Sequence, residues 1–300
     1  MELSQVEAIY SKDMPWGKHP IIPLGDMQIQ PNRELFDERR FREVIQWGVD
    51  NDAYYLGMGD AVDFASPTNR ARLRGAIVEG HLYDSTLDAI EAAAEEHLEW
   101  VKDLLAPTKG RWLGMLEGHH FWEFADGTTT DMRLANFLGC SFLGTSAYVN
   151  LRFPNTVSGK SHRQEVPQIT IWAHHGRAGG KLLATPLNQL EHVVKGFDAD
   201  VYLVGHHHKA TAGRMSRIYP KFKPNGTCTL EHRDIYLACT GSFLKGWVEG
   251  QRRGGRPSST YVEKGMMNPV ALGHIVLWVK PHYRQQNGHG VPTVGITVEV

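Results

Sequence analysis

The ten residues 201–210, VYLVGHHHKA, constrain the fold of this chain more than any other stretch. The run Val201–Val204 is short and mostly apolar and predicts a buried strand. It ends at a glycine followed by His206, His207 and His208. Side chains alternate along an extended chain, so His206 and His208 are expected on one side and His207 on the other. The alternative is a solvated histidine-rich turn, which would be preferred for this tripeptide in isolation.

Other predicted strands of the chain finish in the same kind of chemistry, which favours the metal-site interpretation. The strands and the polar residues after them are Pro20–Leu24 with Asp26 and Gln28, Ala53–Met58 with Asp60 and Asp63, Arg111–Leu116 with His119 and His120, and Gln168–Ala173 with His174 and His175. The carboxyl ends of successive strands converge on one crevice in α/β sheets. Carboxylates and imidazoles together suit Mn²⁺, Fe, Zn²⁺ or Ni²⁺, whereas the absence of cysteine from these motifs argues against a structural zinc site.

The remaining pattern predicts an α/β chain, an α+β sandwich of two mixed sheets packed face to face and flanked by helices. Helices are expected over residues 32–47, from a capping box at Ser85 and Asp88 to Pro107, over Thr130–Leu138, and from an N-cap at Thr185 through Phe197; strands are expected over Ala147–Phe153, Thr227–Cys239, Gly273–Val279 and Thr293–Val300. Residues 64–83 are expected to form a surface loop or short helix, and residues 249–260 a basic loop. We expect a single domain, 1–300, with the metal motifs at about 20–210 and a β-rich part at about 211–300.

Composition limits the classes of partner. A formal charge of −1 argues against a broad, charge-driven grip on nucleic acid. The three cysteines form no CxxC pattern and suggest free thiols in a reducing compartment. No stretch has the length of a signal-peptide core or a membrane span, so we expect a cytoplasmic protein without a membrane partner.

The strand-end residues form a series of motifs: Gly-Asp-x-x-Asp, then Gly-x-His, then His-Gly, then Gly-His-x-His. This order resembles the calcineurin-like metallophosphoesterase superfamily, which includes repair-nuclease-like phosphodiesterases. The phrases LGMGD, LGMLEG, ADVYLVGHHHK and GSFLKGW are similar to members from phages and microbes. The resemblance covers most of the chain and implies a four-layer architecture.

The same resemblance implies a role for each motif residue at a centre of two divalent metal ions. Manganese is the first expectation, with Fe, Zn, Ni or Mg as alternatives. Asp26 and His208 would bind the first metal, His206 the second, and Asp60 would bridge both. His120 stands in the place of the catalytic histidine, which assists the leaving oxygen, and Asp63 would orient a neighbouring histidine. A hydroxide bridging the metals would attack phosphorus.

Two positions depart from the family pattern. Gln28 stands where the family usually has histidine; its amide oxygen is a neutral, harder ligand that favours Mn²⁺ or Mg²⁺, or leaves the site weakly occupied. His119 stands where the family has asparagine, and an imidazole nitrogen there still ligates. The next motif leaves His174 and His175 open as ligands, with His175 favoured because it directly precedes the glycine.

The predicted function is hydrolysis of a phosphodiester, either nucleic acid or a small nucleotide, by a metal-dependent phosphoesterase. The alternatives are a phosphomonoesterase and a catalytically weakened relative that keeps the fold for binding or assembly. Retention of the polar strand-end residues argues against a pure scaffold, because such groups are costly to bury unpaired. The sequence carries no signal for the oligomeric state.

Overall fold

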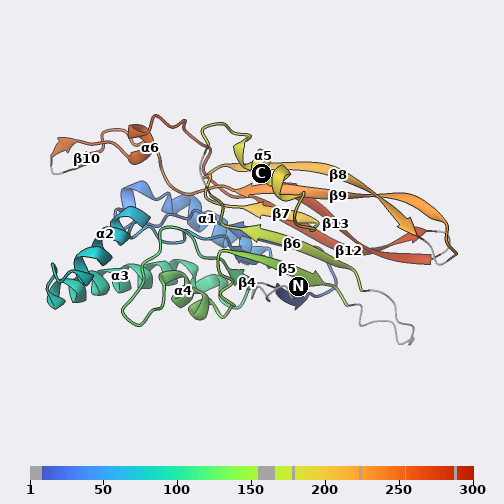
Figure 1. Cartoon of the computed structure of the whole chain (residues 1–300), viewed down its shortest axis with the longest axis horizontal. Helices are drawn as coiled ribbons and strands as arrows, with labels where there is room; N and C mark the ends of the chain where they lie inside the picture. Colours follow the sequence, from blue (N-terminus) through green and yellow to red (C-terminus); the bar gives the residue numbers. More distant parts are fainter. Residues whose placement is uncertain (1–8, 155–165, 178–179, 223–224, 254, 287–288) are drawn as a thin grey trace.

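Two β-sheets packed face to face form the centre of the protein (Figure 1). The computed structural model describes residues 9–154, 166–177, 180–222, 225–253, 255–286 and 289–300. Sheet A has the order β1 (Ile9–Asp13), β5 (Ser146–Arg152), β6 (Gln168–His174), β7 (Val201–Val204), β9 (Cys228–Thr240) and β8 (Ala210–Phe222). Sheet B has the order β13 (His289–Glu299), β12 (Val276–Gln286), β2 (His19–Leu24), β3 (Tyr54–Gly57) and β4 (Trp112–Met115). Both sheets mix parallel and antiparallel pairs, as the sequence predicts.

The strands that precede the polar motifs are parallel neighbours that end level with one another. In sheet B, Leu24 at the end of β2 pairs with Gly57 of β3, and Gly57 pairs with Met115 of β4. In sheet A, His174 of β6 pairs with Val204 of β7. This register brings the loops after the strands to one edge of each sheet.

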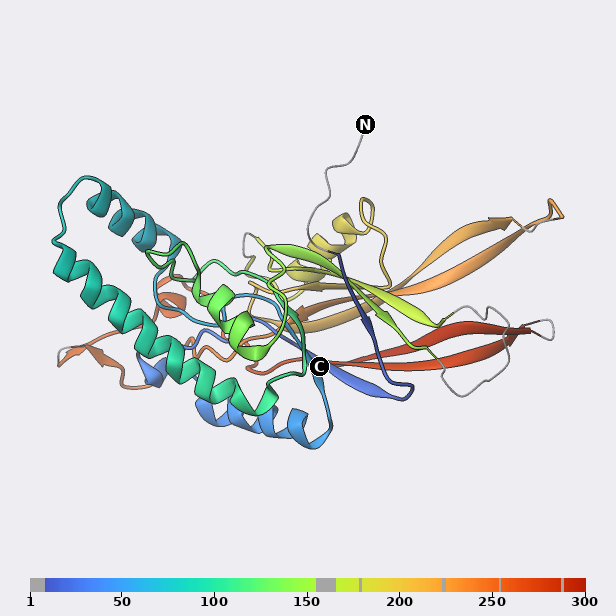
Figure 2. The same cartoon turned by 90° about the horizontal axis from the view of Figure 1, so that it is seen from below.

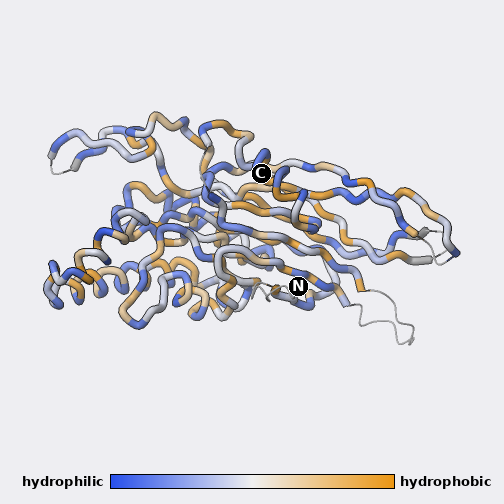
Figure 3. The backbone as a smooth tube through the Cα atoms, in the orientation of Figure 1, coloured by the Kyte–Doolittle hydropathy of each residue, from blue (hydrophilic) through white to orange (hydrophobic). Residues whose placement is uncertain are grey.

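Alternating side chains fill the space between the sheets. Tyr54 and Leu56 of β3 point into this inner core, whereas Tyr55 between them faces the helices outside sheet B. On β6 the inner residues are Ile169, Ile171 and Ala173. This alternation follows from the pleat of a strand, and it decides which side chains face the other sheet and which face the helices. Figure 3 shows the hydrophobic residues along the strands in the middle of the molecule.

Helices complete the expected four layers. The outer face of sheet B is covered by α1 (Glu38–Asp50), α3 (Asp84–Leu105) and α4 (Thr130–Leu138), and that of sheet A by α5 (Thr185–Val193) (Figures 1 and 2). In α3 the residues Ala94, Leu98, Val101 and Leu105 repeat at helical spacing and are buried. None of the described helices is both long and apolar enough to cross a lipid bilayer.

Several helix boundaries differ from the predicted ones. The 32–47 segment divides into a 3₁₀ turn, η1 (Arg33–Leu35), and α1, whose N-cap is Asp37. The capping box at Ser85 does not form, because α3 begins at Asp84 after Tyr83. Likewise Thr185 is the first residue of α5 and Ala184 its N-cap. The polar 64–83 segment contains a helix, α2 (Pro67–Val78), which is capped by Ser66 and buries no residue.

Strands β1 and β8 were not predicted from the sequence. Both lie at the edges of sheet A, where a strand has only one neighbour. β8 is mostly exposed and contains Pro220, a residue that an edge strand tolerates. The β8–β9 and β12–β13 hairpins extend in the same direction away from the helices (Figure 1). The expected basic loop is in part a small hairpin of β10 (Arg252–Arg253) and β11 (Arg256–Pro257).

The burial of individual leucines predicts that the same substitution, leucine to alanine, changes the stability of the protein very differently at two positions. Leu98 is fully buried, whereas Leu182 is 72% exposed. Leu98→Ala should lower the free energy of unfolding by about 2–5 kcal/mol, because it leaves a cavity beneath α3. Leu182→Ala should change it by less than about 0.5 kcal/mol. Urea unfolding of the two variants measures this, and equal losses would contradict the packing described.

Candidate metal centre

The polar residues after the strands lie on tightly turned backbone. The positive φ angles are 48° at Asp26, 50° at Gln28, 53° at Asp60, 64° at His206 and 57° at His208. Residues other than glycine rarely adopt this left-handed conformation, although aspartate and histidine do so more often than most. Such residues cost roughly 1–3 kcal/mol each and cluster at functional sites. The loops support one another through the Asp26 amide to the Gly59 carbonyl (3.1 Å) and the Gln28 amide to the Asp60 carbonyl (3.0 Å).

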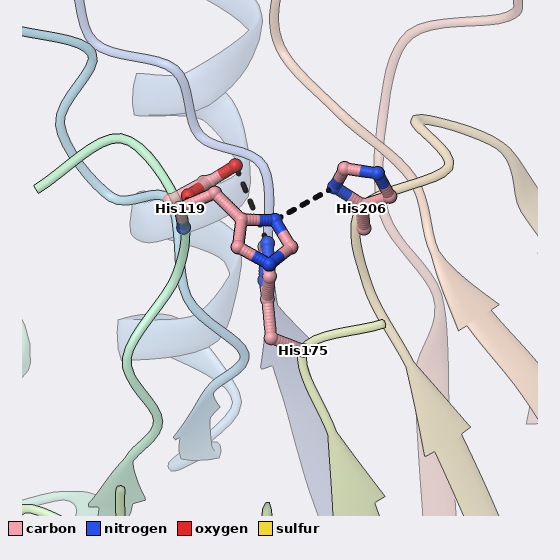
Figure 4. Close-up of side chains that lie close together, drawn as sticks. His119, His175 and His206 are labelled. Carbon is pink, nitrogen blue, oxygen red and sulfur yellow. Dashed lines mark hydrogen bonds and ion pairs between the residues drawn. The ribbon is translucent and has the colours of Figure 1, made fainter. Parts of the chain in front are cut away.

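Four side chains from four different loops form what we call the four-residue cluster: Asp60, His119, His175 and His206. One ligand atom from each lies within 4.8 Å of all the others. Figure 4 shows the three imidazoles converging. The Nδ1 atoms of His119 and His206 are 3.2 Å apart, and His175 Nε2 is 3.4 Å from Asp60 Oδ2. Each residue thus presents an electron-pair donor to the same small volume.

The backbone fixes which nitrogen of His175 can bind a metal once the ring has lost its second proton. Its Nδ1 lies 2.8 Å from the Met58 carbonyl oxygen, which can only accept, so Nδ1 carries the proton. The other nitrogen, Nε2, is buried and has no hydrogen-bond partner among the described residues. A backbone carbonyl that fixes the ring in this way is a recurring support of metal-binding histidines.

Beside the cluster lies a second set, the Asp26 group, made of Asp26, Gln28 and His208. Neither carboxylate oxygen of Asp26 has a hydrogen bond of normal geometry among the described residues, although the side chain is fully buried. His208 Nε2 is 3.6 Å from Asp26 Oδ1. Gln28 Nε2 donates to Asp60 Oδ2 (3.1 Å), while its Oε1 is buried without a partner among the described residues.

These donor sets fit divalent cations. Buried polar atoms without partners are costly, and bound cations would satisfy the Asp26 oxygens and, once its proton has left, His175 Nε2. Burial lowers the pKa of both His206 and His208 to about 4, so both rings are neutral at pH 7 and have lone pairs to give. Burial also lowers the pKa of His119, and His175 adds to that shift. Carboxylate oxygens with neutral imidazoles are typical ligands of Mn²⁺, Fe, Zn²⁺ and Ni²⁺.

The buried acids of the two sets carry opposite shifts. Burial raises the pKa of Asp26 to about 8, with His175 opposing this shift and Asp60 adding to it. Burial alone would also raise the pKa of Asp60, but His175 and His120 reverse the direction and lower it. His175 shows the complementary effect: burial lowers its pKa, but Asp60 overcomes this and raises it to about 9.

His120 and Asp63 form a pair next to the cluster rather than within it. His120 Nδ1 is 2.7 Å from Asp63 Oδ1, and its Nε2 is 4.0 Å from Asp60 Oδ2. Gln30 donates to the other Asp63 oxygen (2.6 Å) and so fixes that carboxylate. Burial lowers the pKa of His120, but the hydrogen bond to Asp63 together with the charges of Asp60, Asp63 and Asp26 outweighs it, and the net shift is upward. The protonated form of His120 is thus favoured relative to a free histidine, and its Nε2 faces Asp60.

The structure shows which of the neighbouring histidines face the four-residue cluster and which do not. Of the open pair, His175 joins the cluster, whereas His174 accepts a hydrogen bond from the Gly176 amide (2.7 Å) and stacks on Trp172. His207 points away from the cluster, as expected, but it is buried and not solvent-facing. Its Nε2 lies 2.9 Å from Gln189 Oε1 on α5.

Sequence reasoning missed two residues that support the loop of His119 and His120. Arg70 of α2 donates to the carbonyl oxygens of His119 (3.0 Å) and Phe121 (2.7 Å), and its guanidinium lies 3.8 Å from the Phe121 ring centre. Asp131 of α4 is buried and accepts from the Gly118 amide (3.1 Å). The closely spaced arginines of residues 64–83 were the available signal for Arg70, whereas nothing in the local pattern marks Asp131.

A cavity of about 760 Å³ lies beside the metal centre. Asp60, His120, His206 and His208 are part of its lining. Several residues between Leu244 and Leu272 line it as well. The site is therefore accessible to a small ligand.

Neither a protein-family model nor a curated protein sequence matches the chain. Two solved structures resemble it at 11% identity. One is a conserved uncharacterized protein, a predicted phosphoesterase, from Streptococcus pneumoniae TIGR4, with a TM-score of 0.32 over 87% of this chain and 82% of that one. The other is Vps29 from Chaetomium thermophilum, with a TM-score of 0.35 over 93% of this chain and 96% of that one.

Structural similarity at TM-scores this low does not indicate a function. The class of protein is therefore defined by its layers and by the side chains of its metal centre. The chain is an α/β two-sheet sandwich with a buried aspartate–histidine group able to hold a metal ion.

Close packing at Gly118 predicts that a single methyl group would disrupt the centre. A Cβ at Gly118 would lie 2.0 Å from Asp60 Oδ1 and 2.1 Å from the Asp60 amide nitrogen, whereas a Cβ at Gly75 meets nothing within 4 Å. Gly118→Ala should therefore displace Asp60 and lower bound metal per chain at least tenfold in elemental analysis. Gly75→Ala, in α2, should bind metal normally and be more stable by about 0.5–1 kcal/mol. Full metal content in Gly118→Ala would refute the geometry.

The raised pKa values predict that metal binding releases protons. Asp26 with a pKa of about 8 and His175 with a pKa of about 9 hold protons at pH 7 in the metal-free protein, and ligation removes them. Metal affinity should therefore rise as the pH increases from 7 to 9. Titration calorimetry of Mn²⁺ in buffers of different ionisation enthalpy counts the protons, and a buffer-independent heat at pH 7 would contradict the expectation.

Proposed function

We propose that the protein is a metal-dependent phosphoesterase that hydrolyses a phosphodiester. The observation that carries the proposal is the placement of Asp60 between two ligand sets, with the hydrogen-bonded His120–Asp63 pair beside them. Asp60 Oδ1 accepts the backbone amides of His119 and His120, while Oδ2 faces both Gln28 and His175. A carboxylate shared in this way suits two neighbouring cations.

Two divalent ions are proposed, one held by the four-residue cluster and one by the Asp26 group with Asp60. When bound, such ions lower the pKa of water and neutralise charge that develops on a phosphoryl group. The neutral amide oxygen of Gln28 is a hard ligand, which favours Mn²⁺ as the native metal, with Mg²⁺ next. Fe, Zn and Ni remain compatible with the histidine-rich cluster.

His120 is proposed to move the proton in the reaction. Water supplies the oxygen of the new P–O bond and loses one proton to solvent. The P–O bond to the leaving group breaks, and the leaving oxygen gains a proton from His120 Nε2, which is reprotonated from solvent. The hydrogen bond from Nδ1 to Asp63 keeps the ring oriented and stabilises its protonated form. Asp63 is thus a positioning residue.

The lack of arginine among the described residues of the cavity lining favours a diester over a monoester. A diester carries one negative charge, whereas a phosphomonoester carries about −1.5 to −2 at pH 7 and is commonly held by arginine. The charged side chains of the described lining are Asp60, Asp63, Lys181, Lys209 and Lys245.

One observation favours the second candidate, a catalytically weakened protein that binds or assembles. The Gln28 amide donates to Asp60 Oδ2, which gives the shared carboxylate a partner that is not a metal. If this bond persists in the presence of metal, the Asp26 group would hold its ion poorly. Metal content distinguishes the two, because the phosphodiesterase requires two equivalents per chain and the binder requires none.

The direct test is hydrolysis of bis-p-nitrophenyl phosphate and p-nitrophenyl phosphate by metal-stripped protein supplied with Mn²⁺, Mg²⁺, Ni²⁺ or Zn²⁺. We expect metal-dependent cleavage that favours the diester. His120→Ala should lower kcat by about 10²–10⁴-fold, the usual contribution of a positioned acid or base. Asp60→Asn should abolish activity and reduce the bound metal.

Two adjacent histidines provide a matched control. His175→Ala should lose activity and one equivalent of metal, whereas His174→Ala should retain both, because only His175 faces the cluster. Absence of turnover with every metal, in folded wild-type protein that binds no metal, would favour the binding protein instead.

A further inference from the structure

Besides the metal-centre residues, much of the cavity lining comes from the two ends, 244–247 and 261–272, of one chain segment, residues 244–272, which we call the wall segment. It leaves sheet A after β9 and enters sheet B before β12, and the bridge between Ser242 and Gly273 closes its base. It contains the short helix α6 (Tyr261–Lys264) and extends beyond the sheets toward the same end of the molecule as α2 (Figures 1 and 2).

The base of the wall segment is fixed to the metal centre. Ser242 Oγ donates to the Asp26 carbonyl oxygen (2.8 Å), and the Phe243 amide donates to the same oxygen (3.3 Å). The Lys245 amide in turn donates to the Leu35 carbonyl (2.7 Å). The wall therefore stands at a fixed position relative to the ligands.

The wall presents large apolar side chains that are only half covered. Exposed fractions are 48% for Trp247, 49% for Tyr261 and 42% for Met267, and all three line the cavity. Leu244, Val262 and Leu272 add aliphatic surface around them. Apolar and aromatic side chains gathered beside a few polar groups are characteristic of a small-ligand pocket.

One cation on the wall is available for an anion. The described lysines that line the cavity are Lys181, Lys209 and Lys245. Lys209 donates to the carbonyl oxygens of Gly180 and Leu182, and Lys181 donates to that of Gly265 (3.5 Å). The Lys245 ammonium has no hydrogen-bond or ion-pair partner among the described residues. It lies on the same segment as Trp247, two residues away.

We propose that the wall segment is a nucleoside subsite and that the substrate is a small nucleotide phosphodiester, an inference that rests on the proposed phosphodiesterase activity. The base stacks on Trp247, and Lys245 pairs with the phosphate while its reacting ester bond faces the metal centre. A cavity of about 760 Å³ accommodates a ligand of this size. A long duplex would instead require a broad basic surface, and the chain has a formal charge of −1.

The test compares two diesters with the same leaving group on the Mn²⁺-loaded protein. Thymidine 5′-(p-nitrophenyl phosphate) carries a nucleoside, whereas methyl p-nitrophenyl phosphate carries a methyl group in its place. We expect kcat/KM to be about 5–100-fold higher for the nucleoside diester, the range that one base–aromatic stack provides. Trp247→Ala should bring this ratio close to one, and Trp247→Phe should retain most of it.

Two controls isolate the effect. Trp16 is similarly exposed, at 41%, but stacks on Tyr283 and does not line the cavity, so Trp16→Ala should leave the ratio unchanged. Lys245→Ala should raise KM for both diesters by similar factors, because it removes a contact to their common phosphate. Thermal unfolding of each variant verifies that it is folded.

The outcomes separate the subsite from the proposed function. A wild-type ratio near one, or a ratio that survives Trp247→Ala, would overturn the subsite and leave the phosphodiesterase intact. Faster cleavage of duplex DNA, falling steeply with added salt, would overturn it in favour of nucleic acid.

Failure of both diesters with every metal would overturn the proposed function. Calorimetric titration with AMP then decides the subsite, because binding lost in Trp247→Ala supports it and equal or absent binding refutes it.

Discussion

The buried carboxylate of Asp60 is the interaction on which the rest of the site depends. It is 1% exposed, and its two oxygens reach groups from the loops after β2, β4 and β6. A buried charge is costly unless it is paired and hydrogen-bonded, so each of these loops must keep its position for the carboxylate to be tolerated. The closeness of Gly118 has the same origin: only a residue without a side chain allows the His119 and His120 amides to approach Asp60 Oδ1.

The rigidity that this arrangement needs comes from the sheets. Parallel strands that end level with one another deliver the loops to one edge, and the inner core between the sheets fixes their register. Left-handed backbone at Asp26, Asp60 and His206 is a local cost that the sequence would not adopt by preference. Local preference and overall fold disagree at these residues, which is where functional sites are expected.

The sequence predicted the layers and most strands because their patterns are local. Hydrophobic alternation and turn residues mark β6 and β7, and helical spacing marks α3. The sequence could not predict β8, an exposed edge strand whose existence depends on pairing with β9.

At the site, the sequence correctly predicted that His207 points away from His206 and His208, but for the wrong reason. The pleat of a strand does not continue past Gly205, and left-handed turns at His206 and His208 orient the rings instead. Contacts such as that of Asp131 with the Gly118 amide join residues 13 apart and leave no trace in local spacing.

Gln28 shows how one side chain links the choice of metal to the geometry of the centre. Its amide has a donor end and an acceptor end, and the donor end already holds Asp60 Oδ2. The acceptor end, Oε1, is buried without a partner among the described residues, so it is the end left for a cation. An imidazole at this position would give a nitrogen ligand, whereas the amide would give oxygen. Oxygen ligands favour Mn²⁺ and Mg²⁺. The two proposed ligand sets would thus be chemically unequal, one rich in imidazole and one in oxygen.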